Sequence, residues 1–218
     1  MQGSLNSDLT VEGVGQAVSL GKELNKHYFD HIYSSTSPRA LETSRLIFGD
    51  EKKTSSDLLG EIAMGAWEGK TYQEIEKLAP LEWNNFFNHP FNYFPSKDGE
   101  SFAQLEARLK VFIKEEGLRE RSGKIAIVSH RITIRMLISL LLNNKELYGE
   151  MDLSSTSLSI IEIENKNAKL KLLNSTASKL AKEATSVPKP PIVTPKYKGE
   201  SCPVNFDNKT AAGTLLMT

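Results

Sequence analysis

Apolar residues recur along the chain in two patterns, one typical of strands and the other of helices. Residues 125–128 form a short, continuous apolar run, which is typical of a strand buried on both faces of a parallel sheet. Residues 132–141 follow with apolar side chains at helical spacing. A shorter strand at 32–33 likewise precedes a helix that opens at Pro38. The chain therefore repeats a strand-to-helix unit.

Polar residues mark the starts of three further helices. Thr10 precedes a segment whose apolar residues recur mostly at three- and four-residue spacing, so one face is predicted to pack on a sheet. The residues of that face are Val11, Val14, Ala17, Val18 and Leu24. Thr71 with Glu74, and Ser101 with Gln104, have the spacing of capping boxes.

Two more strands are predicted near residue 165. Residues 158–160 and 168–172 flank the polar run 164–167, which reads as a tight turn. Helices that alternate with strands in this way predict an α/β sandwich with a largely parallel central sheet flanked by helices.

The composition limits the class of protein. A chain of 218 residues with 39% apolar residues is long enough for one domain with a sizeable core and an appendage. Its formal net charge of zero argues against a nucleic-acid-binding or anionic-membrane surface. The single cysteine, Cys202, excludes an intramolecular disulfide and a cysteine-rich zinc site. Because we find no signal peptide and no apolar run of membrane-spanning length, we expect a cytoplasmic protein.

Three fragments place polar side chains where ligands bind in open α/β sheets. His130 comes directly after the buried run 125–128, at the carboxyl end of that strand. Arg39 lies in the first turn of the helix that opens at Pro38, near the positive end of the helix dipole, which suits a phosphate. Glu61 precedes a tryptophan bracketed by glycines. We expect these fragments to meet in one crevice.

In this order, the fragments resemble the motifs of the histidine phosphatase superfamily, the phosphoglycerate-mutase-like proteins. The resemblance covers residues 2–180 and implies a three-layer sandwich, with a domain at 1–180 and a linker and tail at 181–218. The matching stretches are Leu9-Thr10 with Gly13, Gln16 and Ala17; residues 35–43; residues 61–69; Gly99 to Ser101; Val128-Ser129-His130; and Leu173-Asn174.

The resemblance also implies a chemistry. In this family a histidine attacks phosphorus and forms a phosphohistidine, which water hydrolyses in a phosphatase or which passes phosphate onward in a mutase. By resemblance, His130 binds the transferring phosphoryl oxygens, Arg39 clamps the phosphate and Glu61 acts as general acid and base. No metal or other cofactor is implied, and the partner is a small phosphorylated metabolite or phosphate. Further residues expected to contact the substrate are Gln2, Gly3 and Arg131.

The family motif Arg-His-Gly, which carries the nucleophile, does not occur in this sequence. The chain starts at a segment that resembles the region about ten residues beyond that motif, so the first strand is missing from its usual N-terminal position. His27, His31 and His89 are expected to be ordinary surface or loop residues. Two classes remain open: a phosphomonoesterase without its N-terminal segment, inactive as given, or a non-catalytic phosphate-binding or regulatory domain. A compact core favours a phosphatase over a mutase.

Residues 181–218 differ in composition from the rest. Prolines at 188, 190, 191 and 195, with lysines among them, predict an extended linker. Residues 213–218 again have a strand pattern and resemble the strand that precedes the family's Arg-His-Gly. One interpretation is a tail without fixed structure. The other is that residues 214–218 insert in parallel into the place of the missing first strand, as in a circularly permuted chain.

Several candidate residues have a structural alternative. Arg39 could pair with Glu42 or another carboxylate, and Glu61 could be a solvated loop acid. Arg131 stands where the family has glycine, and could add positive charge to the pocket or obstruct it. Arg135, one helical turn on, is expected to face a carboxylate.

The aromatic residues between positions 67 and 94 also allow two interpretations. Trp67 is expected to anchor its loop by packing. The other aromatic residues line a lid over the substrate or form a small satellite core. They are Trp83, Phe86, Phe87, Phe91, Tyr93 and Phe94.

Overall fold

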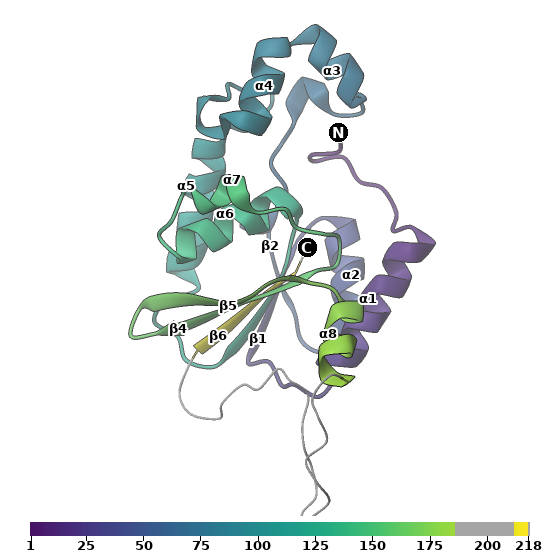
Figure 1. The fold of residues 1–218 in the computed structure, drawn as a ribbon, viewed down its shortest axis with the longest axis vertical. Coiled ribbons are helices and arrows are strands. Elements are labelled where there is room, and N and C mark those ends of the chain that lie inside the picture. The colour runs from purple at the N-terminus through teal and green to yellow at the C-terminus, as the bar shows by residue number, and fades with distance from the viewer. Residues whose placement is uncertain (186–211, 218) are drawn as a thin grey trace, which may run out of the picture.

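A sheet of six strands forms the centre of the protein in a computed structural model, which describes residues 1–185 and 212–217. The strands lie in the order β2-β1-β3-β6-β4-β5 (Figure 1). The first four in this order run parallel, whereas β4 is antiparallel to both of its neighbours. Their bounds are β1 His31–Ser35, β2 Thr54–Ser56, β3 Lys124–Val128, β4 Leu158–Glu164, β5 Asn167–Ser175 and β6 Ala212–Met217.

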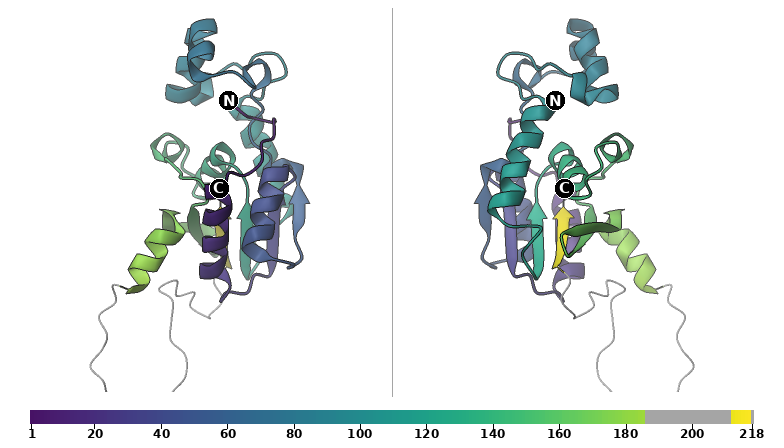
Figure 2. Two further views of the ribbon diagram at one scale, coloured as in Figure 1. Left: turned by 90° about the vertical axis from the view of Figure 1, so that its right-hand side faces the viewer. Right: turned by 90° about the vertical axis from the view of Figure 1, so that its left-hand side faces the viewer.

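Helices cover both faces of this sheet, so the predicted three-layer α/β sandwich with a largely parallel sheet is confirmed (Figures 1 and 2). One face carries α1 Val11–Leu24, α2 Pro38–Phe48 and α8 Ala177–Thr185. The other carries α5 Phe102–Glu115, α6 Arg131–Leu141 and the short α7 Leu147–Glu150. Helices α3 Tyr72–Leu78 and α4 Pro80–Asn88 extend beyond the carboxyl ends of the parallel strands (Figure 1). The 3-10 turns are η1 Asp57–Leu59, η2 Gly65–Trp67 and η3 Pro90–Asn92.

Strand β3 shows why its sequence is continuously apolar. Ile125 and Ile127 pack in the core on the α5 and α6 side, whereas Ala126 and Val128 pack in the core on the α1 and α2 side. All four are at most 1% exposed. A central strand of a doubly covered sheet has no solvent face, so it needs no polar alternation.

The predicted starts of the helices are confirmed by their capping contacts. The Thr71 hydroxyl accepts from the backbone N–H of Glu74, and the Glu74 side chain accepts from Thr71 in return. Ser101 and Gln104 form the same reciprocal box at α5. Thr10 caps α1 by accepting from the backbone N–H of Gly13.

The predicted face of α1 is wrong in its first half. Val11 is 92% exposed and Val14 is also exposed, whereas the helix buries Ala17, Leu20, Gly21 and Leu24. A Cβ at Gly21 would lie 2.8 Å from the carbonyl oxygen of Ile47, so α1 approaches α2 closely at this point. The first turns of the helix border a cavity instead of the core, because Glu12, Gly13 and Gln16 line that cavity.

The end of the chain supplies the fourth strand of the sheet. β6 lies between β3 and β4, with Leu216 opposite Ile127 in parallel and Leu215 opposite Ile160 in antiparallel register. The interpretation of this end as an inserted parallel strand is confirmed for residues 214–217, and the alternative of a tail without fixed structure is wrong for them. The predicted linker is wrong at 181–185, which continue helix α8, whereas its residues 186–211 and Thr218 lie outside the described residues.

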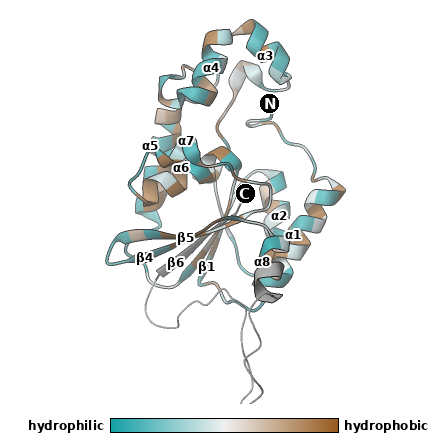
Figure 3. Cartoon of the chain, viewed as in Figure 1, coloured by the Kyte–Doolittle hydropathy of each residue, from teal (hydrophilic) through white to brown (hydrophobic). Residues whose placement is uncertain are grey.

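Strands β4 and β5 form the hairpin that the alternating pattern predicts. Residues Asn167 and Glu164 face one another next to the turn. Along β5, half-buried positions alternate with exposed ones, and Figure 3 shows both polar and apolar residues along the hairpin. Within the described ranges, the helices are too short or too polar to cross a bilayer.

Shortening the chain after Thr185 removes β6 and tests its role in the sheet. We expect the melting temperature to fall by at least about 10 °C, because backbone groups of β3 and β4 lose their partners at roughly 1 to 3 kcal/mol each. Hydrogen exchange of residues 125–128 and 158–163 should become faster. A synthetic peptide of residues 208–218 should restore protection to the shortened chain. Unchanged melting and exchange would contradict a structural role for β6.

Candidate active site

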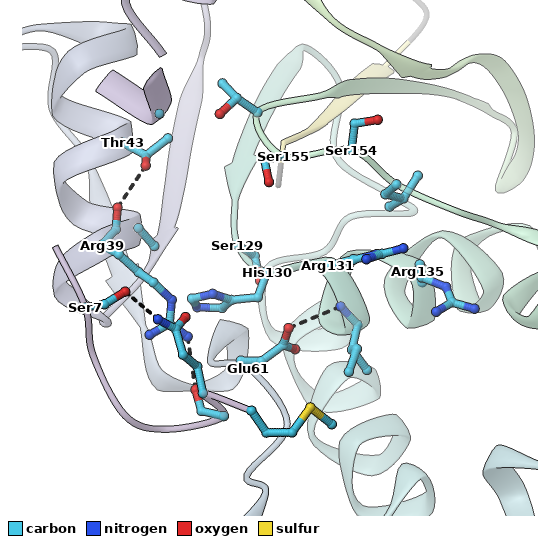
Figure 4. Close-up of a pocket in the computed structure, with 18 of the residues that line it drawn as sticks. Ser7, Arg39, Thr43, Glu61, Ser129, His130, Arg131, Arg135, Ser154 and Ser155 are labelled. Atoms are coloured by element: carbon cyan, nitrogen blue, oxygen red, sulfur yellow. Dashed lines mark hydrogen bonds between the residues drawn. The ribbon is translucent and has the colours of Figure 1, made fainter. Parts of the chain in front are cut away.

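A cavity of about 1010 Å³ opens at the carboxyl ends of the parallel strands (Figure 4). Its wall includes the first residues of the chain, the start of α2, the start of α6 and the loop before β4. All six residues predicted for the site line this cavity: Gln2, Gly3, Arg39, Glu61, His130 and Arg131. The structure therefore brings together residues that are far apart in the sequence.

His130 lies between the end of β3 and the start of α6 and is 7% exposed. Its Nε2 atom is 2.8 Å from the Ser35 hydroxyl and 3.2 Å from the Ser37 hydroxyl. Ser35 is the last residue of β1, and Ser37 precedes α2. The imidazole therefore connects the carboxyl end of β3 with that of the neighbouring strand β1. Sequence reasoning included both serines in a matching stretch but did not assign them this contact.

Burial lowers the pKa of His130 to about 3, and the positive charges of Arg39 and Arg108 act in the same direction. The ring is therefore neutral at pH 7, with a proton on one ring nitrogen and a lone pair on the other. A neutral imidazole still has one N–H group, so it can donate one hydrogen bond to an anion.

Arg39 is held by the first residues of the chain. Its Nη1 donates to the carbonyl oxygen of Leu5 at 2.7 Å, and its Nη2 donates to that of Gly3 at 3.0 Å. The alternative pairing of Arg39 with Glu42 is wrong, since Glu42 pairs with Arg45 at 2.7 Å. Figure 4 shows the guanidinium beside the His130 ring.

The first residues are themselves tightly fixed. Gly3 has a φ of +53°, and a Cβ there would lie 2.5 Å from an oxygen of Glu68 and 2.8 Å from Met64. That Glu68 oxygen accepts from the backbone N–H of Ser4 at 2.7 Å. Only glycine fits this turn, and the turn aims the carbonyl groups that hold Arg39. Gln2 contacts the Ser7 hydroxyl at the rim.

Glu61 is partly buried against the first turn of α6. Its carboxylate accepts from the backbone N–H groups of Ile132 at 3.3 Å and Thr133 at 3.2 Å, and from the Thr133 hydroxyl at 3.0 Å. Burial raises its pKa above the usual value, against the opposite effect of these hydrogen bonds. The alternative of a solvated loop acid is therefore wrong, and burial favours the protonated form of this carboxyl more than water does.

Arg108 supports the site from α5, a role that the sequence did not reveal. Its guanidinium forms two hydrogen bonds with Glu100 at 2.7 and 2.9 Å and donates to the carbonyl oxygen of Gly60 at 2.9 Å. The contact fixes the residue before Glu61. The apolar pattern of α5 identifies the face of the helix that packs in the core, and Arg108 lies outside that pattern. In the sequence, only the nearby stretch Gly99-Glu100-Ser101 indicates that this region belongs to the site.

Two arginines on α6 extend the positive side of the cavity. Arg131 forms an ion pair with Asp152, and both side chains are more than half exposed. Arg135 was expected to face a carboxylate; Glu61 lies near enough to act on its charge, but its Nε and Nη2 donate to the Tyr148 carbonyl oxygen at 3.1 and 2.5 Å. Its guanidinium also lies 4.2 Å from the centre of the Tyr148 ring. The backbone of the α7 turn offers this partner, and no sequence spacing identifies it.

The aromatic residues divide between core and cavity. Trp67 is 5% exposed and packs against the rings of Phe86 and Tyr93 at 5.6 and 5.3 Å, so its role as a packing anchor is confirmed. Phe86 and Tyr93 belong to the core, whereas Phe86 and Phe87 also border the cavity. The cluster is thus partly a core, with its edge facing the site.

The other histidines lie elsewhere. His31 begins β1 at the opposite edge of the sheet, His89 follows α4 and His27 follows α1. Among the residues that the structure describes, His130 is the histidine that lines the cavity. In the same part of the chain, no three His, Cys, Asp or Glu side chains are close enough to hold a metal ion.

Comparison with known proteins agrees with this geometry. The sequence model of the histidine phosphatase superfamily (branch 1) matches residues 1–176. Phosphoserine phosphatase 1 of Hydrogenobacter thermophilus is 28% identical over 179 residues, which cover 80% of this chain and 84% of that protein.

Two solved structures show the same fold. Bacillus stearothermophilus YhfR is similar with a TM-score of 0.73 and 31% identity, over 80% of this chain and 88% of that one. A phosphoserine phosphatase from Entamoeba histolytica, solved in complex with 3-phosphoglyceric acid, has a TM-score of 0.72 and 26% identity. That match covers 83% of this chain and 90% of the other.

The lowered pKa of His130 makes stability depend on pH in a defined direction. Between pH 6.5 and about 3, the unfolded chain binds a proton on this ring and the folded chain does not. The free energy of unfolding therefore falls as the pH falls through this window, by up to about 1.4 kcal/mol per pH unit for this group. His130→Gln should flatten the dependence of stability on pH between 6.5 and 4.

Urea unfolding of wild type and His130→Gln across this range measures the effect. His31→Gln is the matched control for exchanging an imidazole outside the cavity. If the free energy of unfolding depends on pH in the same way for wild type and His130→Gln, the lowered pKa of His130 is wrong.

Proposed function

This chain belongs to the histidine phosphatase superfamily, and we propose that its cavity is a phosphomonoester-binding and phosphoryl-transfer site of the phosphatase type. The observation that carries the proposal is the meeting of Arg39, His130 and Glu61 around one cavity at the carboxyl edge of the sheet. A small phosphorylated metabolite is the proposed substrate. Several relatives bear the names of phosphatases that act on such compounds, phosphoserine among them.

The phosphate would lie between Arg39 and His130. An arginine has five N–H donors, and the contacts to Gly3 and Leu5 use two of them, which leaves others for phosphate oxygens. When the proton of the neutral His130 ring lies on Nε2, this atom can donate one further hydrogen bond to a phosphate oxygen in place of the serine hydroxyls that it contacts here. The first turn of α2 adds the positive end of its dipole. These groups stabilise negative charge as it develops on the phosphoryl oxygens.

Glu61 would act as the general acid for the leaving group and as the general base for water. Burial raises the pKa of its carboxyl, so a larger share of the molecules carries a proton there than in water. A protonated Glu61 can donate to the leaving oxygen and afterwards, as a carboxylate, accept a proton from the attacking water. The backbone N–H groups of α6 keep it in place through both steps.

The nucleophile of this chemistry is a histidine of the motif Arg-His-Gly, which the printed sequence does not contain. We propose that this chain as given binds phosphate without turning over phosphomonoesters. β6 ends beside Val128, next to His130, where a segment carrying such a histidine would enter the cavity. Residues 1–180 with β6 would then form the phosphatase domain.

Phosphate binding should depend on Arg39. Arg39→Ala removes a charge-assisted contact of about 1.5 to 3 kcal/mol, which corresponds to roughly one to two orders of magnitude in affinity for inorganic phosphate or vanadate. Calorimetric titration of both proteins measures it. Arg45→Ala, on the exposed side of the same helix, is the matched control. Equal affinity for phosphate in wild type and Arg39→Ala would show that Arg39 does not bind the phosphate.

Hydrolysis of an aryl phosphate by this chain should not exceed the background rate, because no second histidine reaches the cavity from the described residues. Mass spectrometry after incubation with substrate should find no phosphohistidine. Robust turnover that His130→Ala abolishes would contradict the proposal, since another group would then serve as nucleophile.

A further inference from the structure

We propose that the Thr133 hydroxyl is a positioning group for the proton of Glu61, and that it turns between two acceptors as this carboxyl gains and loses its proton. The role of Glu61 as general acid and base belongs to the proposed function, on which this inference rests. The inference adds a residue of α6 that serves Glu61 in both of its protonation states.

Glu61 takes the place of an N-cap residue on α6. The residue before this helix, His130, makes no capping hydrogen bond with its side chain. Instead, the backbone N–H groups of Ile132 and Thr133, the second and third residues of the helix, donate to Glu61 at 3.3 and 3.2 Å. Figure 4 shows the Glu61 carboxylate beside the start of α6. The carboxylate is therefore held by a helix that is far from it in the sequence.

The two oxygens of Glu61 are held unequally. Oε1 accepts from the backbone N–H of Ile62 at 3.0 Å, from that of Thr133 at 3.2 Å and from the Thr133 hydroxyl at 3.0 Å. Within the described part of the chain, Oε2 accepts only from Ile132, at 3.3 Å. A proton needs a lone pair that no donor already occupies, so Oε2 is the oxygen that carries it. Oε1 remains the anchor in both states.

The Thr133 hydroxyl lies between two acceptors. Its Oγ1 is 2.7 Å from the Gly60 carbonyl oxygen and 3.0 Å from Glu61 Oε1, and a hydroxyl has one proton to donate. The side chain is 0% exposed, so water does not replace either acceptor. A bond to a carboxylate is charge-assisted and therefore stronger, whereas beside a neutral acid the shorter contact to Gly60 is favoured. The direction of the hydroxyl thus follows the charge of Glu61.

The Gly60 carbonyl oxygen stays paired when the hydroxyl turns away from it, because Arg108 Nη2 also donates to this oxygen at 2.9 Å. When Oε2 gives its proton to the leaving oxygen, the negative charge stays on the carboxylate. The Thr133 proton then turns from Gly60 to Oε1. No heavy atom has to move, so the surroundings of Glu61 are already arranged for either state.

Other titratable and charged groups lie around Glu61, and every exchange at position 133 leaves them in place. Arg135 and Tyr148 lie near enough for their charges to interact with that of Glu61. Six more line the same cavity or a smaller one that Glu61 also borders: Arg39, His130, Arg131, Asp57, Glu100 and Arg108. In the ranges that the structure describes, none of these groups forms a hydrogen bond with the Glu61 carboxylate. A difference in the pKa of Glu61 between variants at position 133 therefore reports the hydroxyl.

Exchanging Thr133 for valine removes the hydroxyl and keeps the shape of the side chain. Because the lost hydrogen bond stabilises the ionised form more than the neutral one, Thr133→Val should raise the pKa of Glu61 by about one unit. Thr133→Ser keeps the hydroxyl and should give a pKa close to that of wild type. Carbon-13 NMR titration of the full chain, labelled at the side-chain carboxyl of glutamate, measures these values. Glu61→Gln identifies the signal.

Ser139→Ala is the matched control. Ser139 is also a buried hydroxyl of α6, but it donates to the Arg135 carbonyl oxygen at 2.9 Å, so its exchange should leave the pKa of Glu61 unchanged. In wild type, the resonance of the buried Thr133 hydroxyl proton should shift at the same midpoint pH as the Glu61 carboxyl. This second measurement decides the question if Thr133→Val does not fold.

An unchanged pKa of Glu61 in Thr133→Val, or one that rises equally in Thr133→Ser, would overturn the inference. A Thr133 hydroxyl proton that does not respond when Glu61 titrates would overturn it as well. Calorimetric titration of wild type with inorganic phosphate tests the proposed function separately. If wild type binds no phosphate, the proposed function is wrong, whatever the hydroxyl does.

Discussion

The backbone hydrogen bonds of β6 hold the two parts of the sheet together. On one side lie β3, β1 and β2; on the other lie β4 and β5, and no direct pairing joins the two groups among the described strands. The cavity has walls on both sides of this seam, with His130 after β3 and Asp152 before β4. The distance between the walls therefore depends on a strand that comes from the far end of the chain.

Within the cavity, backbone groups fix the side chains more than other side chains do. Carbonyl groups of the first turn hold Arg39, N–H groups of α6 hold Glu61, and the carbonyl group of Tyr148 holds Arg135. Backbone partners cannot rotate away, so each charged group has a fixed direction before a ligand arrives. Such preorganisation is what makes charges effective in a site shielded from water. His130 is an exception, since side-chain hydroxyls of Ser35 and Ser37 contact its ring, and its neutral state comes first from burial.

Much of this could be predicted from the sequence, because local rules and global packing agree. The continuous run in β3, the capping boxes and the placement of Arg39, Glu61 and His130 in one cavity all followed from spacing, order and resemblance. What could not be predicted depends on backbone groups or on where an element stops contacting the core. The exposure of Val11 and the partner of Arg135 are of this kind, because neither the point where a helix face leaves the core nor a backbone carbonyl oxygen has a sequence signature.

The late position of β6 also sets the order in which the molecule can fold. Residues 186–211 separate it from α8, and closing so long a connection costs entropy before any strand pairing offsets it. Local hairpins and helices, such as β4 with β5, form without that cost. Until β6 inserts, β3 and β4 expose unpaired edges that can associate with the same edges of another molecule. Slow refolding and a tendency to aggregate at high concentration follow from the topology alone, whatever the cavity binds.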